Sequence, residues 1–430
     1  MRIRLLPFIL FCIGFSILLI GEGFLLFQSF HISSEENDLP TRSPVATPSV
    51  SSASADFSLA ARSVRLQNGQ VPDFYVLNGY EITPAAEGMK RIRFMAQSPD
   101  GRLFLTDMYD LSDNSKGSVY ILDDWNEQTK KFGTRHVYLT NLRNPNSIAF
   151  YRDQQGVDWL YLALTDKLVR YRYAARETEP TSAPKTIATF PDYGLSYKYG
   201  GWHLTRTVAS HGDKIYVSVG SSCNACEERS DEWQRASILQ MNPDGTGQKV
   251  YASGLRNAVG IKWVGETLFA TEMGSDHLGN DKPADKLYEI KEGVHYGWPY
   301  CYESLGHVFE DTTIAWKQKN VDCEDVPRSY AAFDAHSAPL GLEYFNKEGT
   351  DERLKDAFLV GLHGSGVVSI GNGYRIVRVN SKGFVQEVVA GFLKNETRIG
   401  RPVDILQNDA NSFFFTDDFA GVLYYVGRSQ

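Results

Sequence analysis

Short runs of aromatic, aliphatic and β-branched residues recur along most of the chain, and each follows a turn-forming segment. Runs of this kind, bounded by turn signals, are typical of β-strands. Six of them align on one hydrophobic position: Leu103, Leu160, Ile215, Leu268, Phe358 and Phe413. Most intervals are about 55 residues, which suits one four-stranded propeller blade but not a β-sandwich. The pattern therefore predicts an all-β fold, a six-bladed β-propeller.

Two further features complete the predicted propeller. The interval from Leu268 to Phe358 is longer than the others, which indicates an insertion at about 277–335. A strand from about Phe74 to Ile82 is expected to pair in the sheet that holds Phe413–Phe415. The two chain ends would then close the ring.

The N-terminal part of the chain has a different pattern. An almost wholly apolar stretch at 5–27 follows two arginines and contains one acidic residue, Glu22. It predicts a membrane anchor within 1–30, with a cleaved signal segment as the open alternative. Residues 31–60 are rich in Ser, Thr and Pro and are expected to form a disordered linker before a propeller domain at 61–430. Either reading of 1–30 places that domain outside the cytoplasm, periplasmic, secreted or membrane-anchored.

Charge and cysteine content limit the possible binding partners and the cellular location of the domain. The net charge of −8 argues against a nucleic-acid surface. Besides Cys12 in the apolar stretch, the chain has four cysteines, an even number that suggests disulfides in an exported domain. The expected pairs are Cys223–Cys226 and Cys301–Cys323. A zinc site made from all four is the competing interpretation, because C-x-x-C is also a metal spacing.

The repeat also aligns charged residues. His203, Arg256, Arg401 and Arg91 each lie twelve residues before the aligned hydrophobic position of their own repeat. Arg93 lies two residues after Arg91 and shares its strand face. Propeller strands radiate from a central channel, so equivalent positions form a ring. The sequence therefore predicts a ring of arginines and one histidine, an anion site with a base beside it.

Several motifs resemble one enzyme family. They include the segment Gly254–Glu303 (G-L-R-N-A-V-G-I-K-W, A-T-E-M-G-S-D-H and Y-G-W-P-Y-C-Y-E), G-G-W-H-L-T-R-T-V, G-S-S-C-N-A-C-E-E, A-H-S-A-P-L-G-L, G-Y-R-I-V-R-V and G-R-P-V-D-I. Their order resembles the pyrroloquinoline quinone-dependent sugar dehydrogenases, in particular the sorbosone and pyranose dehydrogenase branch. The resemblance covers roughly Arg91 to the C-terminus.

The resemblance implies specific site residues. His203 matches the catalytic base that takes a proton from the sugar hydroxyl, while hydride moves to the quinone. The matching cofactor-binding residues are Arg93, Arg256, Asn257 and Arg401. Gly274 and Ser275 match the loop whose oxygens bind calcium, and Asp285 and Tyr296 match polar positions that support it.

The implied function is the oxidation of an aldose, sugar aldehyde or related sugar alcohol. The expected cofactors are pyrroloquinoline quinone and calcium, and the expected partners are a small-molecule sugar, an external electron acceptor (a quinone or cytochrome) and a membrane bound by the N-terminal segment. Two alternatives stay open. A calcium-dependent lactonase uses a similar propeller but needs carboxylates around the metal. A non-catalytic binding module is the other, because His363-Gly364-Ser365 lacks the tryptophan and arginine that follow in many relatives.

Overall fold

The computed structural model describes residues 56–192 and 203–429, which form 30 β-strands and one short 3-10 helix, η1 (Ser230–Glu232). The predicted segment at 1–30 and most of the predicted linker at 31–60 lie outside the described residues. Within the described ranges, no helix is long and apolar enough to cross a membrane.

Six of the sheets in the described residues form the blades. The strands of each blade are given from the inner strand outward. Blade one is β4 (Ile92–Gln97), β5 (Leu103–Asp107), β6 (Gly117–Asn126) and β7 (Lys131–Leu142). Blade two is β8 (Ser147–Arg152), β9 (Asp158–Ala163), β10 (Lys167–Arg172) and β11 (Lys185–Thr189), and blade three is β12 (Arg206–His211), β13 (Lys214–Val219), β14 (Ser237–Met241) and β15 (Lys249–Ser253).

Blades four to six follow the same plan. Blade four is β16 (Ala258–Val264), β17 (Thr267–Glu272), β18 (Asp285–Ile290) and β21 (Ala331–Phe333). Blade five is β22 (Pro339–Phe345), β23 (Ala357–Leu362), β24 (Arg375–Val379) and β25 (Val385–Ala390), extended by β2 (Asp73–Leu77) and β1 (Leu59–Ser63). Blade six is β28 (Pro402–Asp409), β29 (Ser412–Asp417), β30 (Val422–Arg428) and β3 (Tyr80–Ala86).

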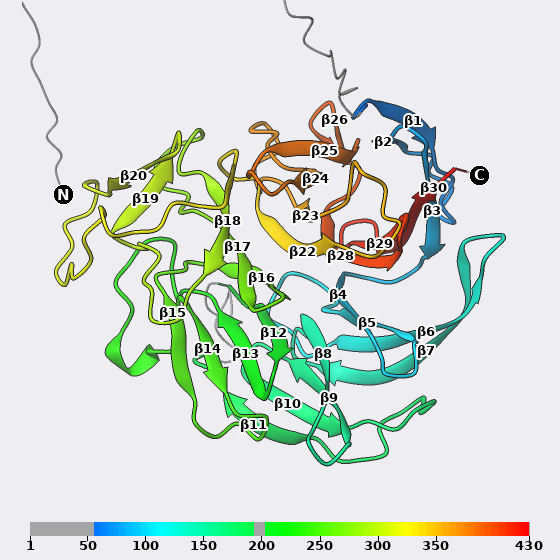
Figure 1. The fold of residues 1–430 in the computed structure, drawn as a ribbon, viewed down its shortest axis with the longest axis horizontal. Coiled ribbons are helices and arrows are strands. Elements are labelled where there is room, and N and C mark those ends of the chain that lie inside the picture. Colours follow the sequence, from blue (N-terminus) through cyan, green and yellow to red (C-terminus); the bar gives the residue numbers. More distant parts are fainter. Residues whose placement is uncertain (1–55, 193–202, 430) are drawn as a thin grey trace, which may run out of the picture. The chain divides into compact units, whose positions relative to one another are not determined.

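The six inner strands close into a ring. Each of β4, β8, β12, β16, β22 and β28 contacts the inner strand of the next blade, and β28 returns to β4. Figure 1 shows these six strands around a common centre. The six aligned hydrophobic positions all lie on the second strands of their blades, from Leu103 on β5 to Phe413 on β29. The predicted six-bladed β-propeller is confirmed.

The chain start is divided between two blades. Tyr80–Ala86 pairs with β30 and completes the sheet that holds Phe413–Phe415, as predicted. Asp73–Leu77 instead pairs with β25 in blade five. The expectation of one strand from Phe74 to Ile82 was wrong, because a turn at Asn78-Gly79 separates the two strands and Gly79 has φ +85°. A positive φ of this kind favours glycine and ends a strand.

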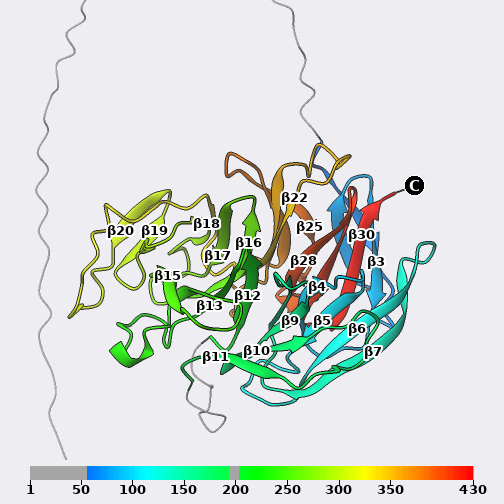
Figure 2. The same ribbon diagram turned by 60° about the horizontal axis from the view of Figure 1, so that its bottom comes forward.

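The insertion lies within blade four, between β18 and β21. It carries the hairpin of β19 (Cys301–Ser304) and β20 (His307–Glu310), which Figures 1 and 2 place at the outer edge of that blade. A disulfide joins Cys301 to Cys323 within it, with an S–S distance of 2.01 Å. A second short hairpin, β26 (Leu393–Lys394) with β27 (Thr397–Arg398), precedes blade six.

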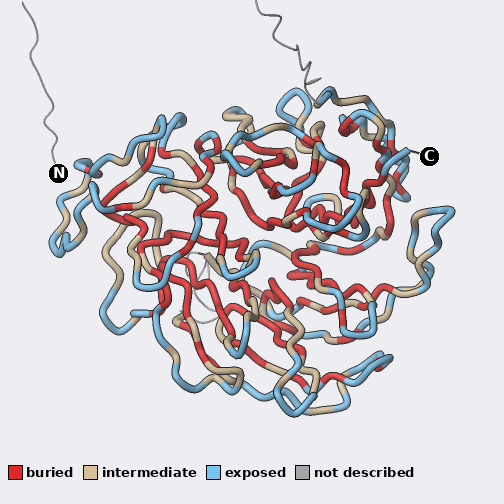
Figure 3. Tube along the Cα trace, in the orientation of Figure 1, coloured by how far each residue is buried: buried red, intermediate tan, exposed pale blue. Residues whose placement is uncertain are grey.

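The core lies between adjacent blades. Figure 3 shows buried residues along the strands and exposed residues mainly in the connecting turns. Between blades four and five, Phe269 and Phe358 pack with ring centroids 4.6 Å apart. Between blades five and six, Phe345 and Phe413 pack in a T-shaped, edge-to-face arrangement with ring centroids 5.7 Å apart. Burial of large aromatic rings at each such interface is a main source of the stability of this fold.

A threonine on the second strand links neighbouring blades at three places. The inner strands β4, β16 and β28 each have a register irregularity that takes one N–H out of the ladder. Thr271 Oγ1 accepts the Gly260 N–H at 2.8 Å and donates to the Leu340 carbonyl, on the next inner strand, at 2.7 Å. Thr106 and Thr416 make the same pair of bonds in blades one and six. The hydroxyl thus links the inner strands of two neighbouring blades and fixes their position relative to each other.

Replacement of this hydroxyl should destabilise the propeller. Thr271→Val keeps the shape of the side chain but leaves a buried N–H and a buried carbonyl without their partner. We expect the free energy of unfolding to fall by about 1–3 kcal/mol, measured by urea denaturation. Thr267→Val, on the same strand but half-buried, is the control. Equal stability of the two variants would contradict this role for Thr271.

Candidate active site

The predicted ring residues lie where the inner strands begin. His203 precedes β12, Arg256 and Asn257 precede β16, Arg401 precedes β28, and Arg93 is the second residue of β4. Their contacts assemble them in two groups. We call the first, on blades three and four, the His203 group; the second, on blades five, six and one, is the Asp418 group.

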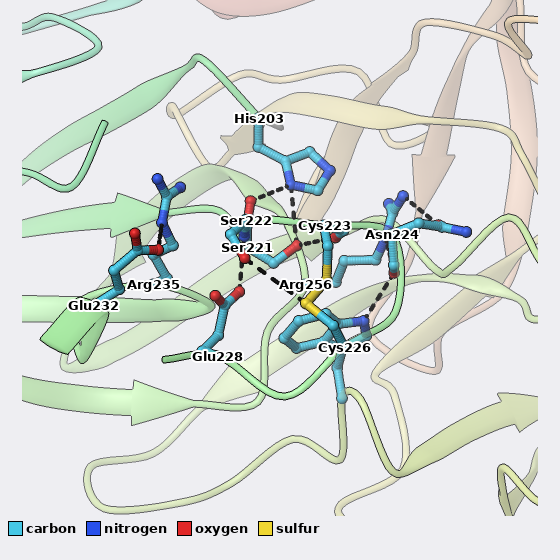
Figure 4. The surroundings of a disulfide bond; sticks show 11 residues. His203, Ser221, Ser222, Cys223, Asn224, Cys226, Glu228, Glu232, Arg235 and Arg256 are labelled. Atoms are coloured by element: carbon cyan, nitrogen blue, oxygen red, sulfur yellow. Dashed lines mark hydrogen bonds and ion pairs between the residues drawn. A yellow bond between two sulfur atoms is a disulfide. The ribbon is translucent and has the colours of Figure 1, made fainter. Parts of the chain in front are cut away.

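The imidazole of His203 is held at Nδ1 by Ser221. Its Nδ1 lies 3.0 Å from the carbonyl oxygen of Ser221 and 3.1 Å from the Ser221 hydroxyl (Figure 4). A carbonyl oxygen only accepts, so we assign the proton to Nδ1, which makes Nε2 the proton-accepting nitrogen. Burial and the neighbouring Arg256 charge lower the pKa of His203 well below its usual range. The ring is therefore neutral at neutral pH.

Arg256 is buried next to His203 and has its guanidinium fixed by several acceptors. Its Nε and one terminal nitrogen donate to Asn224, and the same terminal nitrogen lies 3.0 Å from the Asp276 carboxylate. The Arg256 carbonyl accepts the Ser221 N–H at 2.7 Å. Ser221 therefore connects the histidine and the arginine directly.

Asn257 completes the His203 group. Its N–H donates to the carboxylate of Glu272, and burial raises the pKa of Glu272 to about 7. Its side-chain oxygen lies close to Gly220, where an added Cβ would come within 2.6 Å of Asn257 Oδ1 and 2.5 Å of the His203 Cβ. Glycine at 220 is therefore needed for His203 and Asn257 to lie side by side.

The loop with Gly274 and Ser275 directly follows β17. The Gly274 N–H donates to Asp285 at 2.7 Å, and the other carboxylate oxygen of Asp285 accepts the Ala338 N–H at 2.7 Å. Burial raises the pKa of Asp285 to about 6. An added Cβ at Gly274 would come within 2.6 Å of Pro283. The loop is therefore fixed from two sides, and Ser275 is buried.

The Asp418 group is centred on a fully buried carboxylate. One oxygen of Asp418 accepts from Arg93 at 2.9 Å and from Arg91 at 3.2 Å, and the other lies 2.8 Å from Nε2 of His363. Burial opposes the charge of Asp418, but these neighbours hold its pKa below its usual range. Burial lowers the pKa of His363 to about 3, so neutral His363 donates a hydrogen bond to ionised Asp418.

Arg401 joins this group through the backbone. Its Nε donates to the His363 carbonyl at 3.0 Å and a terminal nitrogen donates to the Gly364 carbonyl. Its own carbonyl accepts the Asp418 N–H at 3.2 Å. Burial lowers the pKa of Arg401 to about 10, which leaves the guanidinium charged at neutral pH. The guanidinium of Arg401 donates to backbone carbonyls, which do not cancel its positive charge. The guanidinium of Arg93, in contrast, pairs with the Asp418 carboxylate.

An apolar layer lies next to both groups along the inner strands. Phe94, Val259, Leu340 and Val403 come from four different blades and pack together with Met273. Phe94 directly follows Arg93, and Val403 lies two residues after Arg401. The Asn257 amide reaches this layer by donating to the Met273 sulfur at 3.4 Å. A buried apolar layer thus lies beside fixed cations and a neutral histidine.

Sequence reasoning missed several members of the site. Asp418, Asn224 and Asp276 are the groups that hold the predicted arginines in place. Asn146 also fixes Arg93 by accepting from its Nε at 3.0 Å. The repeat gave no signal for these residues because they lie outside the twelve-residue alignment.

The predicted disulfide Cys223–Cys226 lies beside the His203 group, with an S–S distance of 1.90 Å (Figure 4). Together with Cys301–Cys323 it confirms both predicted pairs and excludes the four-cysteine zinc site. All four of these cysteines are oxidised, which is typical of proteins outside the cytoplasm.

Comparison with known proteins agrees with this architecture. The model of the TrAA12-like family matches residues 74–429. The chain belongs to the TrAA12-like family. An uncharacterized protein of Borreliella burgdorferi is 27% identical over 301 residues, which are 63% of this chain and 74% of that protein.

Solved structures share the propeller of this TrAA12-like protein. The holo form of the pyranose dehydrogenase PQQ domain from Coprinopsis cinerea matches with a TM-score of 0.66 and 17% identity, over 83% of this chain and 97% of that one. The calcium structure of the Trichoderma reesei family AA12 enzyme matches with a TM-score of 0.66 and 18% identity, over 82% and 96%. At these identities the likeness concerns the fold.

Proposed function

We propose that this TrAA12-like protein oxidises an aldose, a sugar aldehyde or a related sugar alcohol, with pyrroloquinoline quinone and calcium as cofactors. The observation that carries the proposal is neutral His203, with Nε2 as its proton-accepting nitrogen, beside Arg256 and the apolar layer. The solved relatives with a pyranose dehydrogenase PQQ domain and with calcium support both cofactors.

The residues present suit this quinone, a planar molecule with three carboxylates. The apolar layer gives the neighbourhood of the site a low polarity, and Arg256 and Arg401 offer fixed guanidinium groups for carboxylates. Asn257 and Arg93 are the further proposed contacts. Arg93 already pairs with Asp418, so we assign it mainly the task of keeping the ring in place. When bound, the quinone supplies the electrophilic centre that accepts hydride.

Calcium would be held at the loop after β17. Gly274 and Ser275 offer backbone and hydroxyl oxygens, the ligand type that calcium prefers. Asp285 fixes the Gly274 peptide with its 2.7 Å bond and so supports the loop. The Asn257 amide contacts Met273 of the same segment, so the loop that would hold the cation is linked to the His203 group.

His203 acts as the general base in this proposal. A sugar hydroxyl approaches Nε2, and the proton moves to that nitrogen while the hydride leaves the adjacent carbon. Ser221 holds Nδ1–H, so the ring keeps the correct tautomer during the transfer. An external acceptor would take up the electrons after sugar oxidation. The two disulfides agree with an extracytoplasmic location, on a membrane or secreted.

Reconstitution tests the proposal. We expect chelator-treated protein to reduce an artificial dye only when pyrroloquinoline quinone, calcium and a reactive sugar are all present. Omission of each component in turn is the control, and magnesium in place of calcium tests the choice of cation. Binding of the quinone without dye reduction by any sugar of a broad panel would instead favour a binding module.

A further inference from the structure

The Cys223–Cys226 loop contacts Arg256 through one residue. Arg256 Nε donates to the Asn224 carbonyl at 2.9 Å, and Arg256 Nη2 donates to the Asn224 side-chain oxygen at 2.8 Å (Figure 4). Two bonds from one guanidinium to two oxygens of one residue fix both its position and its plane. Asn224 therefore orients Arg256 more completely than a single acceptor could.

Two other parts of the site meet at the same residue. The Trp298 indole N–H donates to the Asn224 carbonyl at 3.2 Å, and the Asp276 N–H donates to its side-chain oxygen at 2.9 Å. Trp298 belongs to the insertion in blade four and Asp276 to the loop after Ser275. Four donors from three segments thus converge on the two oxygens of Asn224.

The disulfide fixes the backbone of this residue. Cys223 and Cys226 are three positions apart and enclose Asn224 in a short covalent ring. The Ser221 hydroxyl donates to the Cys223 carbonyl at 2.6 Å, and the Ser222 N–H donates to Glu228 at 2.8 Å. The same Ser221 holds His203. The covalently closed loop therefore contacts the proposed anion ligand directly and reaches the proposed base through Ser221.

The side chain of Asn224 is an uncharged amide, and this determines the charge that Arg256 retains. An amide oxygen accepts hydrogen bonds from Arg256 without cancelling its positive charge, whereas a carboxylate would pair with that charge. The carboxylate that does touch Arg256, Asp276, has a side chain that is 56% exposed, so its attraction is screened by water. Arg256 is thus rigidly held and still cationic, which is what an anion ligand requires.

We propose that Asn224 is a positioning residue for Arg256, and that the Cys223–Cys226 bond keeps it in place; the inference rests on the proposed binding of an anionic quinone. It acts through Arg256 and does not itself touch the cofactor. Loss of Asn224 or of the disulfide releases the guanidinium, and a negative charge at 224 competes with the anion.

Cofactor affinity gives the first test. Titration of the chelator-treated full chain with pyrroloquinoline quinone, followed by tryptophan fluorescence, should show Kd raised about tenfold in Asn224→Ala. Asn224→Asp should raise Kd similarly while keeping or raising Tm, because it strengthens the bond to Arg256 but neutralises its charge. A purely structural residue would lower Tm in Asn224→Ala and leave Kd of Asn224→Asp unchanged.

The two disulfides provide a matched comparison. The pair Cys223→Ala with Cys226→Ala should raise Kd as much as Asn224→Ala, and combining all three changes should add little, because the bond acts through Asn224. The pair Cys301→Ala with Cys323→Ala should lower Tm without changing Kd. Equal Kd in folded Asn224→Ala and parent protein would overturn the proposal.

A second measurement needs no cofactor. Modification of Arg256 by a dicarbonyl reagent, followed by mass spectrometry, should be faster in Asn224→Ala and in the Cys223/Cys226 double variant than in the parent. Arg152, whose side chain is 67% exposed, serves as internal reference. If the parent binds no quinone but Arg256 reactivity changes as stated, the proposed function fails and the positioning role stands. Unchanged reactivity in both variants refutes that role.

Discussion

His203→Gln should reduce kcat by about 10²–10⁴, the usual contribution of a positioned general base, while leaving the affinity for quinone nearly intact. Glutamine keeps a polar side chain of similar length but cannot accept a proton at neutral pH. Arg256 and Arg401 hold the anion in this proposal. The hydrogen bonds that fix their guanidinium groups go to Asn224 and Asp276 and to the backbone of His363 and Gly364. Dye reduction with saturating sugar gives kcat, and quinone titration of the same preparation gives Kd.

The pH profile supplies an independent readout. A base must be unprotonated, so activity is lost as the pH falls through the folded-state pKa of His203. Burial and Arg256 lower that pKa well below its usual range, so the acid limb of kcat should lie below pH ~6.5. His211→Gln, at the far end of β12, is the matched histidine control. Parental turnover in His203→Gln with every reactive sugar would remove His203 from the mechanism.

Much of the fold could be predicted from the sequence because the positions that repeat are hydrophobic and buried in every blade. Leu103, Ile215 and Phe413 are all buried on second strands, and their spacing follows from the four strands of each blade. The start of the chain could not be placed this way. Phe74 and Ile82 both face the core but belong to different blades, and hydrophobic pattern alone does not say which sheet receives a strand. The Asn78-Gly79 turn was the available signal.

The site was predicted in part for a similar reason. Register places Arg256 and Arg401 at the starts of inner strands, since every blade repeats the same path. Register says nothing about partners, because Arg93 meets Asp418 across 325 residues of sequence and Arg256 meets Asn224 across 32. Those partners decide whether the charge of an arginine is cancelled by a carboxylate. The sequence therefore located the cations without separating their roles.

A buried carboxylate on an inner strand should make the propeller less stable as the pH rises. Asp404 on β28 is buried and accepts the Met95 N–H at 2.9 Å, and a Cβ added at Gly341 would come within 2.3 Å of its Oδ1. Burial raises the pKa of Asp404 to about 7, above the value of about 3.9 expected in the unfolded chain. Below about pH 4 both states hold the proton, and between about 4 and 7 only the folded state does.

Stability contributed by the retained proton is thus present at low pH and lost as the pH rises through about 7, a change of up to roughly 4 kcal/mol. Asp404→Asn carries no charge in either state and can still accept the Met95 N–H. The free energy of unfolding in urea should therefore be higher in Asp404→Asn than in the parent at about pH 8, with the difference shrinking toward pH 4. Asp409→Asn, exposed on the same strand, controls for general charge effects. A constant difference across this pH range, or a variant less stable at pH 8, would show that Asp404 is ionised and stabilised in the folded protein, with Lys262 as a source of compensating positive charge.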